Sequence, residues 1–81
     1  MARLSSKLDK EQKLVRMGAA IRARRKLLGL SQEGLAITAG IERSNMGKIE
    51  RGENNLSVLN LLRISDALAT RAADILADAG L

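Results

Sequence analysis

Glycines divide this chain into short segments of helical periodicity, and this division constrains the fold more than any other feature. Gly29, Gly40 and Gly52 each follow a stretch in which apolar residues recur at three- or four-residue steps, the spacing of one helix face. Glycine ends helices readily because it adopts a left-handed backbone at little steric cost. No sustained alternation of apolar and polar residues and no Asn-Gly or Asp-Gly turn is present, so no strand is predicted.

Five helices are expected, which predicts an all-α fold, a compact five-helix bundle. Ser31 and Ser57 stand where side chains commonly cap helix N-termini, and Gly40 allows a tight turn between the second and third helices. Residues 1–9 precede the first helical pattern and are predicted to be a flexible basic arm. The helices are expected over about 10–28, 31–39, 42–51, 57–69 and 72–79, with Leu14, Met17, Ile21, Leu28, Leu35, Ala36, Ala39, Ile41, Met46, Ile49, Val58, Leu61, Ile64 and Leu68 facing inward. The last of these helices carries Ile75 and Leu76.

The composition excludes several classes of function. At 81 residues the chain is long enough for one domain, and this leaves no room for a separate ligand-sensing domain. With no Cys, no His and no aromatic residue, it lacks a disulfide framework, the usual zinc ligands and a platform for base stacking. No acid, base and nucleophile converge, so we expect neither an enzyme nor a cofactor, metal or small-molecule ligand. No apolar run is long enough to span a membrane, and a cytoplasmic protein is predicted.

The net charge of +5 is distributed unevenly. Residues 1–30 contain nine Lys or Arg and two acidic residues, whereas residues 31–81 contain five and seven. A polyanion such as nucleic acid would explain a basic half, and so would a solvated basic helix that keeps the protein soluble. Arg3 and Lys7 would either follow a DNA groove, as basic arms do, or belong to a terminus that contributes only charge.

Two short helices joined at Gly40 have the layout of a helix-turn-helix. The outer face of the second of these helices carries Arg43, Ser44, Gly47 and Lys48, which are short or basic groups. Arg and Lys bind guanine edges in the major groove, and Ser bonds to several bases. The alternative is an exposed polar helix face with no partner. Glu42 precedes this helix and would either lower DNA affinity or accept a hydrogen bond from a cytosine amino group.

The order of residues resembles a known family. The runs 21–41 (IRARRKLLGLSQEGLAITAGI) and 42–62 (ERSNMGKIERGENNLSVLNLL) are similar to the lambda-repressor-like, Cro/C1-type helix-turn-helix transcriptional regulators. The second run is also similar to the controller proteins of restriction-modification systems. The resemblance implies that residues 10–81 form a helix-turn-helix DNA-binding and dimerisation domain. It implies a sequence-specific regulator that binds double-stranded DNA in the major groove, with a near-palindromic operator. The alternative is an antitoxin or an adaptor that retains the fold.

The resemblance also implies roles for individual residues. Arg25 and Glu50 match a structural ion pair, and Arg25 has an independent reason to be paired because it falls on an apolar stripe. Base-edge contacts are implied for Arg43, Ser44 and Lys48, a base or backbone contact for Asn45, and DNA-backbone contacts for Gln32 and Arg51.

A homodimer is expected because the fourth helix has more apolar surface than one core stripe needs. Leu59 and Leu62 lie off the main stripe, and Ile75 adds an apolar group from the last helix. These three residues are predicted to form the dimer interface. The alternative is that the last helix folds back and covers them.

Overall fold

Five α-helices form the fold of residues 12–81, the part of the chain that the computed structural model describes. The expected arm at residues 1–9 lies outside this range. The all-α expectation is confirmed, and no strand occurs between residues 12 and 81. None of these helices is long and apolar enough to cross a bilayer. The helices are α1 (Lys13–Leu27), α2 (Gln32–Ala39), α3 (Arg43–Arg51), α4 (Val58–Ala67) and α5 (Ala72–Asp78).

Two serines cap helices as the sequence predicts. The Ser31 hydroxyl accepts a hydrogen bond of 2.9 Å from the backbone N–H of Gly34 at the start of α2. The Ser57 hydroxyl accepts one of 3.0 Å from the N–H of Asn60 at the start of α4. Gly40 ends α2 with a φ of 70°, a left-handed conformation that residues with a Cβ adopt at a cost. Local chemistry therefore fixes both ends of α2 and the start of α4.

The core contains one fully buried aliphatic side chain from each helix. Ile21, Leu35, Met46, Ile64 and Ile75 each have less than 2% of their surface exposed. Burial of such side chains is the main favourable term in a chain of this size.

Two positions of the predicted inner stripes are exposed, and their assignment to the core is wrong. Val58 is 73% exposed and Leu28 is 53% exposed. Val58 is the first residue of α4, and Leu28 is the cap that follows α1. Both lie on an inward-facing stripe by periodicity, but at the end of a helix, where the stripe is open to solvent.

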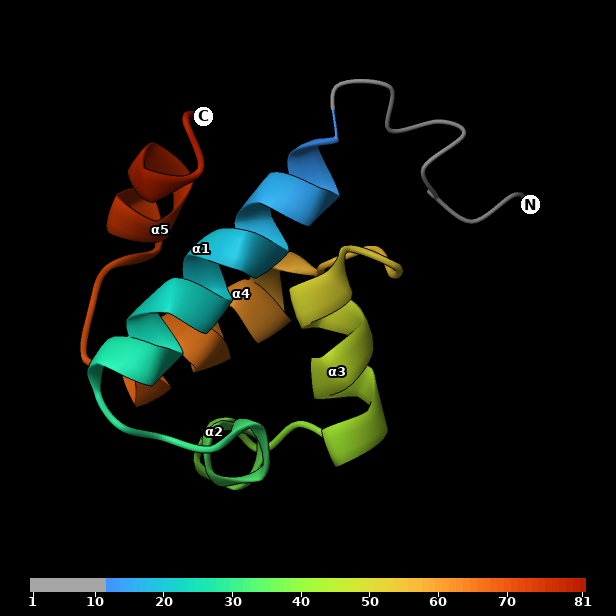
Figure 1. Ribbon diagram of the computed structural model, residues 1–81, viewed down its shortest axis with the longest axis vertical. Helices are drawn as coiled ribbons and strands as arrows, with labels where there is room; N and C mark the ends of the chain where they lie inside the picture. The colour runs from blue at the N-terminus through green and yellow to red at the C-terminus, as the bar shows by residue number, and fades with distance from the viewer. Residues whose placement is uncertain (1–11) are drawn as a thin grey trace.

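The first helix, α1, crosses the centre of Figure 1 in front of α4. α1 packs against α3 and α5, while α2 packs against α3 and α4. Figure 1 shows α2 almost end-on below and α3 upright beside it, so the two helices cross steeply at one edge of the bundle. The turn at Gly40 thus leaves one side of α3 outside the bundle.

Close contact between α1 and α3 depends on Gly18, to which the sequence assigned no role. A Cβ at this position would lie 2.5 Å from the carbonyl oxygens of both Ile49 and Glu50, much closer than van der Waals contact. Only glycine fits there without moving a helix backbone. The contact fixes how α3 sits on α1, and therefore which face of α3 is turned outward.

Two arginines of α1 hold the C-terminal end of α5. Arg16 donates 2.9 Å hydrogen bonds to the backbone carbonyls of Ala79 and Gly80. Arg24 pairs with Asp78, and this hydrogen bond raises the pKa of Arg24. Cations at a helix C-terminus are favourable because the carbonyl ends carry partial negative charge. Part of the basic first third of the chain therefore stabilises the fold.

Candidate nucleic-acid interface

The turn between α2 and α3 positions α3 with one face in the core and the other in solvent. Met46 and Ile49 are buried with 0% and 3% of their surface exposed, and Ile41 is buried at the entry to the helix. Arg43, Ser44 and Lys48 lie on the opposite, exposed face. The helical period places residues 44 and 48 one turn apart on this face.

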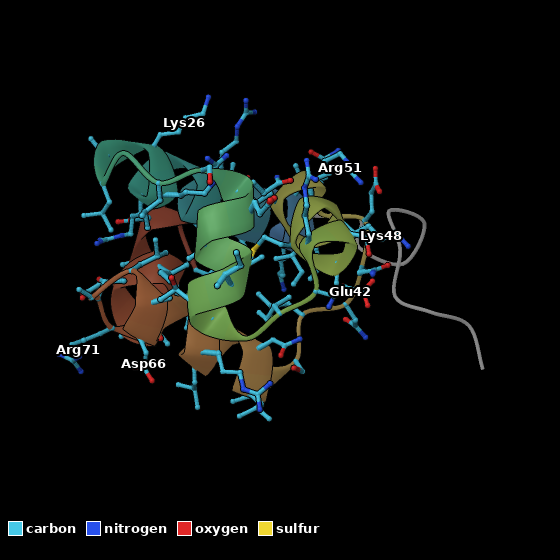
Figure 2. All side chains as sticks on the ribbon, turned by 90° about the horizontal axis from the view of Figure 1, so that it is seen from below. Lys26, Glu42, Lys48, Arg51, Asp66 and Arg71 are labelled. Carbon is cyan, nitrogen blue, oxygen red and sulfur yellow. The ribbon has the colours of Figure 1, made fainter. Side chains whose placement is uncertain are left out.

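A shallow cavity on this face brings together most of the residues predicted to contact DNA. It has a volume of about 370 Å³ and is open to solvent. Figure 2 shows that the Lys48 and Arg51 side chains extend on the same side of α3. The cavity therefore combines cationic and hydrogen-bonding groups on the exposed face of α3. Its lining residues are Gln32, Arg43, Ser44, Gly47, Lys48 and Arg51.

Arg25 and Glu50 form a buried ion pair beneath this face. Arg25 Nε donates to Glu50 Oε2 at 2.7 Å and Arg25 Nη2 donates to Oε1 at 3.0 Å. The remaining guanidinium nitrogen donates to the Leu30 carbonyl at 2.9 Å. The hydrogen bonds that Arg25 donates to Glu50 raise the pKa of Arg25. All buried side-chain polar atoms between residues 12 and 81 have partners, so this charge is fully satisfied.

Gln32 connects the buried pair to the surface. Its Nε2 donates to Glu50 Oε1 at 3.1 Å, and its other side-chain atoms reach the cavity. The first residue of α2, an internal carboxylate of α3 and a cation of α1 are thus linked in one network. The network holds α2 and α3 in a fixed relation at the point where both border the cavity.

Gly47 leaves room for two of the side chains that line the cavity. A Cβ there would lie 3.1 Å from Arg51 Nη1 and 3.3 Å from Gln32 Oε1. Both neighbours are the ends of flexible side chains, so the site tolerates a small shift. Gly47 lies within α3 at a cost to helix propensity, and it allows Arg51 and Gln32 to approach the helix surface.

Besides Gln32, four of the predicted DNA-contacting residues already bond to neighbouring side chains. Arg51 donates to both oxygens of Glu53, which raises the pKa of Arg51 and lowers the pKa of Glu53. Asn45 Oδ1 accepts a 3.2 Å hydrogen bond from Asn54 Nδ2 in the loop after α3. The other two, Arg43 and Ser44, contact Glu33 and Glu42 respectively.

The predicted dimer residues separate into two groups. Leu59 and Leu62 are 57% and 47% exposed on α4, and Val58 extends this row. Ile75 is fully buried in the core, so its assignment to an exposed interface is wrong. The last helix packs against α1 and α4, but it leaves Leu59 and Leu62 exposed.

The sequence did not single out Glu33 or Glu53 as residues of this face. The position of Glu53, two residues after Arg51, is a signal for the local ion pair that the two residues form. Glu33 lies on α2 and meets Arg43 across the turn at 3.9 Å, a contact that depends on the angle between the two helices. No cluster of three or more potential metal-ligating acidic, Cys or His residues occurs between residues 12 and 81.

Comparison with known proteins gives consistent matches. The model of the family HTH_3, described as helix-turn-helix, matches residues 21–75. The chain is 36% identical over 61 residues to control protein C.SmaI from Serratia marcescens, covering 75% of this chain and 73% of that protein. It resembles the crystal structure of the restriction-modification controller protein C.AhdI from Aeromonas hydrophila, with 40% identity, a TM-score of 0.75 and coverage of 76% and 94% of the two chains. It also resembles the clp gene regulator ClgR from Corynebacterium glutamicum, with 28% identity, a TM-score of 0.82 and coverage of 84% and 87%.

Proposed function

The chain belongs to the helix-turn-helix family HTH_3, and from this premise we propose that it regulates transcription by binding specific sequences of double-stranded DNA as a homodimer. The observation that carries the proposal is the cavity on α3, where three cations and two hydrogen-bonding side chains converge. An exposed helix with this surface fits the major groove, whose width admits one α-helix.

Two kinds of DNA contact follow from the positions of the side chains. Arg43, Ser44 and Lys48 extend from the outer face of α3 and would meet base edges, where Arg forms two hydrogen bonds with guanine. Gln32 and Arg51 lie at the sides of this face, at the start of α2 and the end of α3. There they would bind phosphates, which fix the register of the helix in the groove. Asn45 is not among the residues that line the cavity; it bonds to Asn54 and would contact a base or the backbone.

A dimer is supported by the exposed apolar row on α4. Val58, Leu59 and Leu62 are each at least 47% exposed, and residues three and four positions apart share one helix face. Exposed apolar patches of this kind commonly mark protein interfaces. A two-fold dimer would present two copies of α3 to successive major grooves, about 34 Å apart, on a near-palindromic operator.

The relatives favour one regulatory role among those open to this fold. C.SmaI is a control protein and C.AhdI is a restriction-modification controller protein, and the similarity to both extends over three quarters of this chain. We therefore propose that this chain is a controller of a restriction-modification system.

Selection of bound duplexes from a random pool tests the proposal. We expect enrichment of one half-site present twice in inverted orientation, with centres about 10 base pairs apart. Binding should weaken as salt rises, because phosphate contacts release counterions. A pool that returns no enriched sequence would contradict sequence-specific binding.

Sedimentation of two matched variants tests the dimer separately. Leu62→Glu should produce monomers because it places a charge in the proposed interface. Leu27→Glu is the control, since Leu27 is 86% exposed at the end of α1 and lies outside the α4 row. If Leu62→Glu sediments as the native chain does, the interface lies elsewhere.

A further inference from the structure

Glutamates contact three of the side chains proposed to bind DNA. The most direct contact is between Arg51 and Glu53: Arg51 Nε donates to Glu53 Oε2 at 2.9 Å and Arg51 Nη2 donates to Oε1 at 3.2 Å. This two-bond geometry is the one with which arginine also binds a phosphate. The pKa of Glu53 is lowered first by these hydrogen bonds and further by the charges of Arg51 and Lys48. Glu53 therefore interacts with two cations of the cavity.

The other two glutamates hold residues near the start of α3. Glu33 on α2 approaches Arg43, with 3.9 Å between Oε1 and Nη1. The Ser44 hydroxyl donates to Glu42 Oε1 at 2.5 Å. Figure 2 shows Glu42 on the same side of the molecule as Lys48. The candidate interface therefore carries one carboxylate for each of its two arginines and one for its serine.

Fold stability does not account for these contacts. The side chains of Arg43 and Glu33 are 74% and 50% exposed, and those of Arg51 and Glu53 are 58% and 53% exposed. Exposed ion pairs of this kind contribute little to the free energy of unfolding. Glu50, in contrast, is 3% exposed at its side chain and is part of the core network. The three surface glutamates also lie where DNA phosphates would approach, a position that is electrostatically unfavourable for a carboxylate.

We propose that these three glutamates compete with DNA for the side chains they hold. Glu33 and Glu42, which hold the base-contacting Arg43 and Ser44, thereby weaken binding to non-cognate duplex more than binding to the operator, whereas Glu53, which holds Arg51, weakens binding to both. The inference rests on the proposed function and assigns a specificity role to residues that would not themselves bind DNA. The competitor is part of the same chain, so it is present at every encounter with a duplex.

The expected selectivity follows from what each kind of DNA offers in exchange. Non-cognate binding depends almost entirely on phosphate contacts, and a phosphate replaces the carboxylate with a bond of similar geometry. The operator offers Arg43 a guanine edge with two hydrogen bonds, in addition to its phosphates. Arg43 is therefore released from Glu33 more readily on the operator than on other sequences.

Charge-neutralising variants test this proposal. Glu33→Gln and Glu53→Gln each remove one competing carboxylate and keep the size of the side chain. The matched control is Asp66→Asn, which changes the net charge equally. Asp66 is exposed on α4, and Figure 2 shows it on the side of the molecule opposite Lys48 and Arg51. Thermal melting of all three variants verifies that the fold is retained.

Fluorescence anisotropy with a random-sequence duplex and with the selected operator gives the readout between 50 and 200 mM salt. Each Gln variant should bind the random duplex more tightly than the native chain. One additional cation available to phosphate steepens the slope of log affinity against log salt by about 0.9, so this gain should shrink about 3.5-fold across the salt range. The ratio of operator to random affinity should fall for Glu33→Gln, whereas Glu53→Gln should strengthen binding to both duplexes about equally, because Arg51 is the proposed phosphate contact. Asp66→Asn should change neither the slope nor the ratio.

Two outcomes distinguish this inference from the proposed function. If the native chain prefers an operator but the Gln variants behave as Asp66→Asn does, competition by the glutamates is wrong and the proposed function stands. If the native chain shows no preference for any sequence, the proposed function fails first.

Discussion

Removal of the Glu50 carboxylate should destabilise this fold more than any change at a surface ion pair. Glu50→Ala would deprive Arg25 of two hydrogen bonds and Gln32 of one. Arg25 would remain buried, with 11% of its side chain exposed, and only the Leu30 carbonyl as a partner. Breaking one side of a buried pair costs about 3–5 kcal/mol. A chain of this length has a total stability of about 4–12 kcal/mol, so much of it would be lost.

Urea unfolding followed by circular dichroism measures this loss. Asp78→Ala is the matched control, because it removes the partner of the neighbouring Arg24, whose side chain is 31% exposed. Its effect should be much smaller, since water screens and solvates the freed cation. If Glu50→Ala lowers the free energy of unfolding no more than Asp78→Ala, the Arg25 charge is effectively solvated and the reasoning from burial is refuted.

A double variant keeps the test informative if Glu50→Ala does not fold. Replacing both members of a buried ion pair with apolar residues is often neutral or stabilising, because no charge remains to be desolvated. Arg25→Met combined with Glu50→Leu should therefore be more stable than Glu50→Ala alone. A double variant as unstable as the single one would show that packing, and not the unpaired charge, causes the loss.

Three further variants test separate parts of the structure. Arg43→Ala should reduce discrimination at one base pair by about 1–3 kcal/mol; an equal loss of binding on random duplex would instead make Arg43 a phosphate contact. Gly18→Ala should cost about 1–3 kcal/mol in urea unfolding, because its Cβ would overlap the carbonyls of Ile49 and Glu50; native stability would show that α1 and α3 separate easily. Ser57→Ala should lower the free energy of unfolding by about 1 kcal/mol through loss of the α4 cap, and an unchanged midpoint would contradict that role.

Sequence periodicity and caps were sufficient to predict the helices because both are local properties. Ser31, Ser57 and Gly40 determine where α2 and α4 begin and where α2 ends, through contacts within three residues. Periodicity also identified which face of each helix turns inward. It did not indicate how far along the helix the core extends, and Val58 and Leu28 were misplaced for that reason. Ile75 was misplaced because the direction in which α5 folds back is a tertiary property.

The candidate site was predictable where it depends on one helix and not where it depends on two. Arg43, Ser44 and Lys48 share a face through the helical repeat alone. The contact of Arg43 with Glu33, in contrast, requires the crossing angle of α2 and α3. The position of α3 on α1 likewise depends on Gly18, whose role emerges only when the backbones of these two helices are in contact. A lone glycine within a helical pattern gives no indication of the element it will meet.

The distribution of charge changes what the net value of +5 implies about DNA binding. Within the basic first third, Arg16, Arg24 and Arg25 bond to other parts of the fold. Around the cavity, the two arginines are each matched by a glutamate. Long-range attraction of a duplex depends on the summed field, whereas base contacts depend on which individual groups can exchange partners. Under the proposed function, net charge therefore governs how fast the protein associates with DNA. The transfer of a guanidinium group from a glutamate to a base edge governs which DNA sequence stays bound.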